Sequence, residues 1–179
     1  MKHSRIHAAF VMALAACTLA GCESGSASAA RGAPAGTHRM GAGPLLLQEV
    51  RNAGQLGNEL DVQPLRDPQV EDLRGLASSA EARGDYAAAA DAIAKAIELS
   101  PQDPDLLQWQ AEMSLVKHDW DGAHQYATQS WDRGPKLGGL CRRNWTTLQL
   151  ARESRGDTGN AAIAQQRIGQ CAVNPPVRM

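Results

Sequence analysis

Between residues 67 and 133, apolar and polar positions follow one another with the period of an amphipathic helix. Ala89, Ile93, Ala96 and Ile97 recur at three- and four-residue spacing, which puts them on one helix face. Aspartates and glycines mark where such helices begin and end, because aspartate caps a helix start and glycine closes a helix in a left-handed conformation. The pairs that do so are Asp67-Pro68, Gly84-Asp85, Asp103-Pro104 and Gly156-Asp157.

A period of 34 residues relates residues 83–104 to residues 117–136. It aligns Asp85 with Asp119, Tyr86 with Trp120, Ala89 with Ala123 and Pro101 with Pro135. This pattern resembles the tetratricopeptide repeat (TPR), in which antiparallel helix hairpins stack side by side. A less regular third copy places Trp145, Leu148, Gly156, Asp157 and Ala161 in frame.

The resemblance implies an all-α fold, a short TPR-like solenoid of antiparallel helix hairpins over residues 67–175. Two repeats are clear, at about 70–103 and 104–137, and the third covers about 142–175. Upstream, residues 44–66 form an N-terminal capping segment in which Leu46, Val50, Ala53 and Leu60 have helical spacing. We expect a short helix that covers the open N-terminal face of the first repeat. A loop with a brief strand is the alternative.

The first 21 residues have the parts of an export signal, with basic residues followed by an apolar run too short to span a membrane comfortably. The run ends in Leu19-Ala20-Gly21-Cys22, which resembles the lipobox of bacterial lipoproteins. That resemblance implies cleavage before Cys22 and acylation of its thiol, and Glu23 favours the outer membrane. An ordinary secretory signal with a chance cysteine is the alternative.

Residues 22–43 are small and polar and predict a flexible tether between the lipidated Cys22 and the domain. Without residues 1–21, the chain keeps 16 of its 18 lysines and arginines against all 19 acidic residues. This balance gives no reason to expect nucleic acid, and membrane contact is expected through the lipid anchor only.

Two of the four cysteines remain for the folded domain, since Cys17 leaves with the signal and Cys22 takes the lipid. In the repeat frame, Cys141 lies just before the first helix of the third repeat and Cys171 at the end of its second helix. Antiparallel helices bring such ends together, so we predict a disulfide in an oxidising compartment. Two free buried thiols are the alternative.

In TPR proteins the first helix of each repeat lines a concave groove that holds peptides or partner helices. The resemblance projects that groove onto Glu71, Arg74, Ser78, Glu81, Asp105, Gln108, Glu112, Leu115, Arg143, Thr146 and Leu150. Only Arg74 and Arg143 approach the basic clamp of chaperone-binding members, and no asparagine accompanies them. Trp120 and Trp145 fall at core positions, whereas Trp109 and Trp131 are candidate surface anchors.

The sequence predicts no catalytic residue, metal site or cofactor. His118 and His124 have the wrong spacing to share one helix face, and Cys141 has no histidine base in its own repeat. We therefore expect a non-enzymatic scaffold or adaptor, lipid-anchored on the periplasmic face of the outer membrane, in cell-envelope or pilus assembly. The alternative is an accessory regulator of an envelope (peptidoglycan) hydrolase. A small structural lipoprotein whose repeats only pack on each other is the simplest case.

Overall fold

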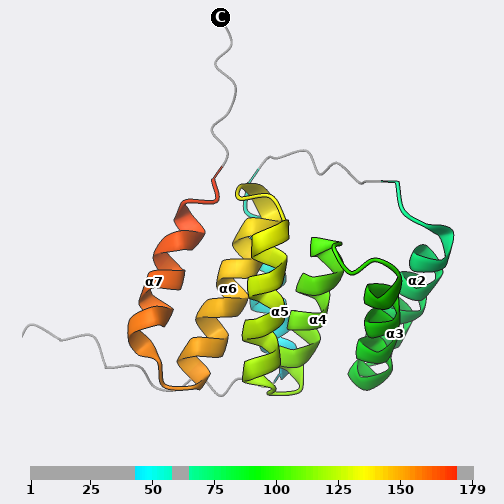
Figure 1. Cartoon of the computed structure of the whole chain (residues 1–179). Coiled ribbons are helices and arrows are strands. Elements are labelled where there is room, and N and C mark those ends of the chain that lie inside the picture. Colours follow the sequence, from blue (N-terminus) through cyan, green and yellow to red (C-terminus); the bar gives the residue numbers. More distant parts are fainter. Residues whose placement is uncertain (1–42, 58–64, 173–179) are drawn as a thin grey trace, which may run out of the picture. The chain divides into compact units, whose positions relative to one another are not determined.

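Seven helices make up the part of the chain described by the computed structural model, residues 43–57 and 65–172 (Figure 1). They are α1 Gly43–Gly54, α2 Pro68–Ala82, α3 Tyr86–Leu99, α4 Pro104–Val116, α5 Trp120–Arg133, α6 Gly138–Ser154 and α7 Thr158–Gly169. These residues contain no strand, so the all-α expectation is confirmed. The predicted signal, the lipid site at Cys22 and residues 22–42 of the predicted tether lie outside the described residues, as does Leu60. Gly43, the last residue of the predicted tether, is the first residue of α1.

Side-chain caps start most of the helices where the sequence predicts. Asp67 and Asp103 each accept a hydrogen bond from a backbone N–H of the first turn that follows. The same geometry recurs at Asp85, Asp119 and Asp157. Gly84 and Gly156 adopt left-handed φ values of 75° and 77°. The hairpin turns are therefore set by local chemistry.

Three consecutive hairpins, α2–α3, α4–α5 and α6–α7, stack along one direction to give the predicted TPR-like solenoid (Figure 1). Within the stack, α3 contacts α4 and α5 contacts α6. Ala89 and Ala123, at equivalent positions of the first two hairpins, are both fully buried. Their small side chains let the paired helices approach closely. The third hairpin is present, and its first helix begins at Gly138.

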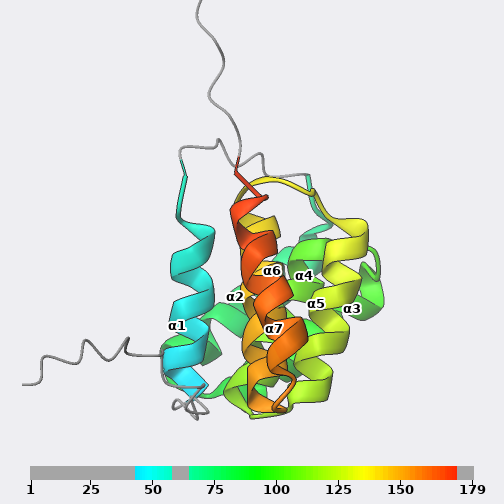
Figure 2. The ribbon, with the colours of Figure 1, turned by 90° about the vertical axis from the view of Figure 1, so that its left-hand side faces the viewer.

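Helix α1 does not cover the first repeat, and this part of the sequence prediction is wrong. Instead α1 packs along α4 and α6, the first helices of the second and third repeats. Figure 2 shows α1 on one side of α6 and α5 on the other. The physical reason is apolar complementarity, because Leu46 and Val50 share one hydrophobic cluster with Leu115 and Leu150.

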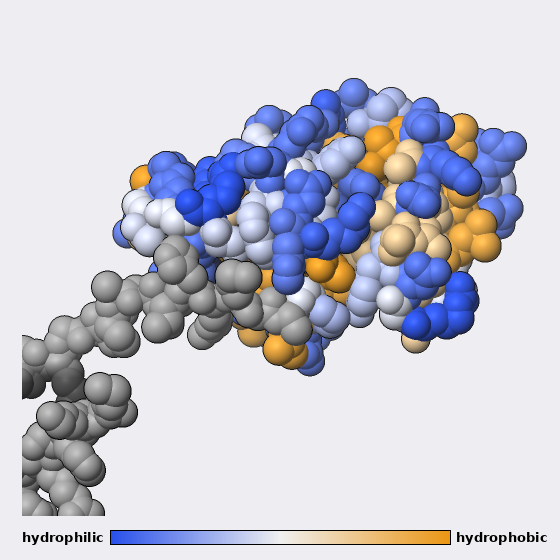
Figure 3. Space-filling model, turned by 90° about the horizontal axis from the view of Figure 1, so that it is seen from below, coloured by the Kyte–Doolittle hydropathy of each residue, from blue (hydrophilic) through white to orange (hydrophobic). Residues whose placement is uncertain are grey.

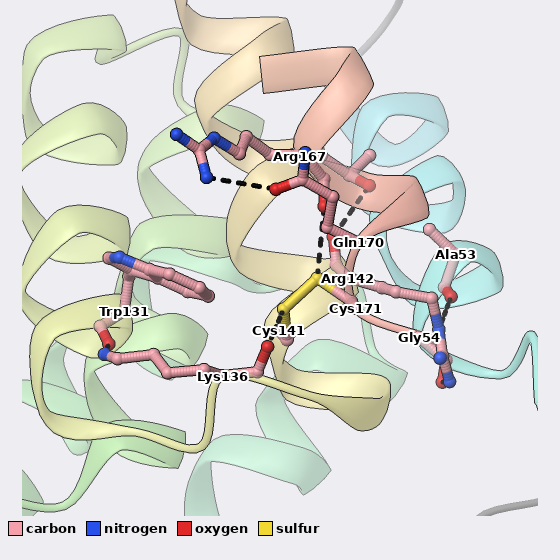
Figure 4. Close-up of a disulfide and its surroundings, with 10 residues drawn as sticks. Ala53, Gly54, Trp131, Lys136, Cys141, Arg142, Arg167, Gln170 and Cys171 are labelled. Atoms are coloured by element: carbon pink, nitrogen blue, oxygen red, sulfur yellow. Dashed lines mark hydrogen bonds between the residues drawn. A yellow bond between two sulfur atoms is a disulfide. The ribbon is translucent and has the colours of Figure 1, made fainter. Parts of the chain in front are cut away.

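Cys141 and Cys171 form a disulfide that ties the end of α7 to the start of α6 (Figure 4). Their Cα atoms are 5.6 Å apart, and both residues are buried. Cys141 lies inside the first turn of α6, whereas the sequence placed it just ahead of that helix. Gly138 reinforces the junction by donating its backbone N–H to the carbonyl of Cys171, at 2.7 Å. The last hairpin is thus closed covalently at its open end.

Replacing both cysteines by alanine should destabilise the domain by about 3–4 kcal/mol, because the 30-residue loop regains its freedom in the unfolded chain. Urea unfolding of the oxidised wild type and the double variant measures this difference. A reducing agent should lower the stability of the wild type and leave the variant unchanged. Equal stability of wild type and variant under oxidising conditions would contradict a stabilising bond.

Candidate partner groove

The predicted groove residues lie on the first helices of the three hairpins, but most are not open to solvent. Five of them on α4 and α6 are buried, namely Gln108, Glu112, Leu115, Thr146 and Leu150. On α2, Glu71 and Ser78 are exposed, while Arg74 and Glu81 are partly exposed. The concave face is therefore covered over α4 and α6, and it is α1 that covers it.

The covering helix presents an apolar side to the groove. Leu46 and Val50 are 2% and 0% exposed, and they pack with Leu115 of α4 and Leu150 of α6. The neighbouring Leu47 joins a second cluster, with residues of α2, α3 and α4 that include Ala80 and Met113. Burial of such side chains stabilises the docked helix by about 1.5–3 kcal/mol each. The apolar positions Leu46 and Val50, seen in the sequence at helical spacing, thus form the surface through which α1 docks.

An ion-pair network centred on the buried Glu112 forms the polar half of the same contact. Glu112 of α4 is 0% exposed, and its two carboxylate oxygens face opposite partners. One oxygen lies 3.2 Å from Nε of Arg51 on α1, and the other lies 2.7 Å from Nη2 of Arg143 on α6. Arg51 also reaches Glu81 of α2, with 2.9 Å between its Nη1 and the carboxylate. One network therefore joins α1, α2, α4 and α6.

Gln108 extends the network along α4. Its side-chain amide donates to Oγ1 of Thr147 on α6 at 2.8 Å, and to the Glu112 carboxylate at 3.1 Å. Both glutamine and threonine are fully buried, so these bonds replace the water lost by the amide nitrogen of Gln108 and by the hydroxyl of Thr147. The pair holds the facing sides of α4 and α6 in register.

Arg51 keeps its positive charge in this setting. Burial of the side chain acts to lower the pKa of Arg51, but the hydrogen bonds and charges of Glu81 and Glu112 outweigh that effect. The pKa of Arg51 is therefore raised above its ordinary value. The groove holds the guanidinium as a cation between two carboxylates.

Both ends of α1 fit closely against backbone. At the first residue of the helix, a Cβ on Gly43 would collide with the backbone of Val116 at the end of α4. At the other end, a Cβ on Gly139 of α6 would come within 2.7 Å of the carbonyl oxygen of Gly54. Arg142 then donates to the carbonyls of Ala53 and Gly54, at 3.0 and 3.4 Å (Figure 4). The last carbonyls of α1 are thus capped by α6.

The α2 side of the groove is built differently. Trp109 of α4 donates its indole N–H to Glu81, and Arg74 lies over the same ring at 5.3 Å from its centroid. Trp109 is therefore an inter-repeat contact. Trp131 likewise packs against Trp145 at 5.0 Å and lies under the ammonium of Lys136. Neither tryptophan stands free as a surface anchor.

Asp105 is not brought to the α1 contact. It lies at the start of α4, where Arg66 reaches it at 3.1 Å and reaches Asp103 at 3.5 Å. These residues border a hollow of about 590 Å³ at the ends of the helices, together with Leu65, Pro101, Pro104, Pro135 and Leu140. This hollow and the concave face are separate places on the domain.

The outer surface is mixed in polarity. Seen from below, hydrophobic residues gather over the alanine-rich α2–α3 end, and the α6–α7 end is more hydrophilic (Figure 3). Leu76 of α2 and Leu99 of α3 are among the large apolar side chains exposed on these two helices, at 62% and 50%. No helix in the described part of the chain is both long and apolar enough to cross a membrane.

Neither histidine of the repeats belongs to a metal cluster, since the described residues hold no suitable group of three ligands. His118 occupies a left-handed position, with φ 58°, and stacks on Trp120. Burial, and then the charges of Arg155 and Arg152, lower the pKa of His124. These effects favour the neutral form of the His124 ring.

The fold and the filled groove define a TPR-like helical-repeat domain. Among solved structures, it is similar to the globular C-terminal domain of LpoP from P. aeruginosa. That likeness has 27% sequence identity and a TM-score of 0.53, and it covers 59% of this chain and 99% of the LpoP domain. No protein-family model and no curated protein sequence matches the chain.

The sequence missed the residues that complete the site. The repeat frame covers only the solenoid, so it gave Glu81, Glu112 and Arg143. It did not give Arg51 of α1, which pairs with both glutamates. The available signal was the amphipathic pattern of residues 46–51, where an arginine directly follows the last apolar position. A helix with that pattern beside an acidic groove was a candidate occupant.

Replacing Gly139 by alanine should loosen the docking of α1, because the new methyl group meets the backbone of Gly54. We expect a loss of about 1–3 kcal/mol in unfolding free energy, typical of overpacking. Gly75→Ala is the matched control, since a Cβ at this exposed position of α2 meets open space. The control should gain about 0.5–1 kcal/mol from better helix propensity. Similar effects of both substitutions in urea unfolding would refute the close contact.

Proposed function

We propose that this chain is a lipid-anchored, non-enzymatic adaptor of the bacterial cell envelope that binds other proteins through its concave face. The observation that carries the proposal is the groove itself. Its apolar floor and paired carboxylates are shaped to hold an amphipathic helix, and they hold α1. The likeness to the LpoP domain and the lipobox-like residues 19–22 support the envelope setting.

Two classes of partner fit such an adaptor: enzymes that build or cut peptidoglycan, and proteins of pilus or outer-membrane assembly. The likeness to the LpoP domain favours the first class, so we propose an accessory regulator of a peptidoglycan enzyme. In this proposal the regulator contributes binding and no chemistry of its own. Glu81 and Glu112 bind an arginine of the helix that occupies the groove, so they suit recognition of an arginine on a partner helix. Arg143 of α6 also pairs with Glu112.

The anchor that we propose is the acylated Cys22 on the periplasmic side of the outer membrane. The 20 residues between Cys22 and α1, rich in glycine, alanine and serine, would then act as a flexible tether. Such a chain has a typical end-to-end distance of about 25 Å and can extend considerably further. The domain would thus work within a limited distance of the membrane.

A photo-crosslinking amino acid at Ser78 should capture the partner in intact cells, because this side chain is exposed on the α2 side of the concave face. The same amino acid at Asp91, exposed on the second helix of that hairpin, is the matched control. We expect a peptidoglycan enzyme enriched from position 78 but not from position 91, by mass spectrometry. Enrichment of pilus or barrel-assembly proteins would transfer the proposal to assembly. No enrichment in repeated trials would overturn the adaptor.

Cys22→Ser should remove the anchor and release the protein into the soluble periplasmic fraction. Fractionation of the envelope followed by immunoblotting measures the distribution of wild type and variant. Cys141→Ser is the control, since it removes a cysteine of the folded domain and leaves the anchor intact. If Cys22→Ser protein still fractionates with the outer membrane, lipid attachment at this residue is wrong.

A further inference from the structure

Helix α1 binds to the repeats through side-chain contacts, as a separate peptide ligand would. It belongs to none of the three hairpins, and its backbone lies along α4 and α6. Leu47 adds a side-chain contact to the apolar cluster of α2, α3 and α4. The sequence neighbour α2 is also reached through long side chains, such as Arg51 to Glu81. This is the arrangement of a helix bound in the groove of a repeat protein.

The groove selects for a particular sequence. Leu115 and Leu150 receive apolar side chains four residues apart, at Leu46 and Val50. Glu81 and Glu112 receive a cation at the very next position, Arg51. The requirement is therefore two adjacent apolar residues, a third apolar residue four positions after the first, and an arginine directly after the third.

The charge requirement is strict because Glu112 is fully buried. A partner lacking the arginine would leave Glu112 with Arg143 and the hydrogen bond from Gln108. Glu81 would keep the indole N–H of Trp109 but lose the guanidinium that Arg51 supplies. Leaving a buried charge underpaired is unfavourable, so such a partner is disfavoured even when its apolar side chains fit.

The helix is also suited to leave. It is 12 residues long, a length at which a helix is marginal in water without packing partners. One whole side of α1 faces solvent, including Pro44, Leu45, Gln48 and Asn52. The stability of α1 therefore comes from the contacts of one face, and another helix with a similar apolar face could make the same contacts with the groove.

We propose that the concave face is a receptor for an amphipathic partner helix with the pattern of Leu46-Leu47-x-x-Val50-Arg51, and that α1 is the resident occupant which this partner displaces. The inference rests on the proposed adaptor function and deepens it by naming the chemistry of the partner. Displacement makes α1 an internal competitor of the partner helix. The apparent affinity for the partner is therefore the intrinsic affinity multiplied by the fraction of molecules whose groove is open.

The test uses purified protein without its lipid and a fluorescein-labelled peptide of residues 43–54. Arg51→Glu puts a third carboxylate against Glu81 and Glu112 and should release α1. Asn52→Glu, on the exposed side of α1, is the matched control. By fluorescence anisotropy the Arg51→Glu protein should bind the peptide about tenfold or more tightly than wild type or control. A peptide carrying glutamate in place of the arginine should lose that gain.

Equal binding of the peptide by the Arg51→Glu protein and by wild type would overturn the proposal, as would equal binding of the two peptides. Hydrogen–deuterium exchange of the wild-type protein tests the same point if the variant fails to fold. Amides of α1 should exchange about tenfold or more faster than amides of α4 and α6, through openings that leave the solenoid folded. Exchange of all three helices at one common rate would show that α1 never leaves alone.

These measurements test the displacement of α1 separately from the adaptor function. They use only the purified chain and a peptide of its own sequence, so they can succeed when no envelope partner is recovered by crosslinking. Conversely, a captured enzyme with an α1 that never opens would keep the adaptor and reject displacement.

Discussion

The buried carboxylate of Glu112 is the constraint around which the concave face is organised. A charge without solvent contact must be paired, and Glu112 is paired from two sides, by Arg51 of α1 and Arg143 of α6. No single helix supplies both arginines. The carboxylate therefore requires α1, α4 and α6 to meet at one point, and Glu81 extends the requirement to α2.

Apolar burial and the ion pairs have different roles in this contact. The buried leucines and valine of α1 stabilise its docking, but an apolar surface alone tolerates a shift of the helix along the groove. The ion pairs fix the register, because a shift by one residue would take Arg51 from its carboxylates. Close backbone contacts at Gly43 and Gly139 then set how deep the helix lies.

The solenoid was predictable from sequence because its signals are local or periodic. Asp85 and Asp119 cap equivalent helices, and the repeat places Ala89 and Ala123 at equivalent crossings. The pairing of Cys141 with Cys171 follows from the same frame. The position of α1 was not predictable in this way. Its amphipathic pattern predicts that it packs on an apolar surface. The pattern does not identify that surface, because the surface is formed by side chains of α4 and α6 far along the chain.

The disulfide links the completeness of the fold to the compartment that surrounds it. Helix α7 packs only on α6 among the described helices, through small residues such as Ala161 and Ala164. In a reducing environment α7 would lose its covalent link to α6 and would be held by its non-covalent contacts with that helix. A chain retained in the cytosol would thus carry a frayed end that proteases recognise, and an exported chain would not. The Cys141–Cys171 bond therefore couples the order of the last hairpin to the redox conditions around the chain.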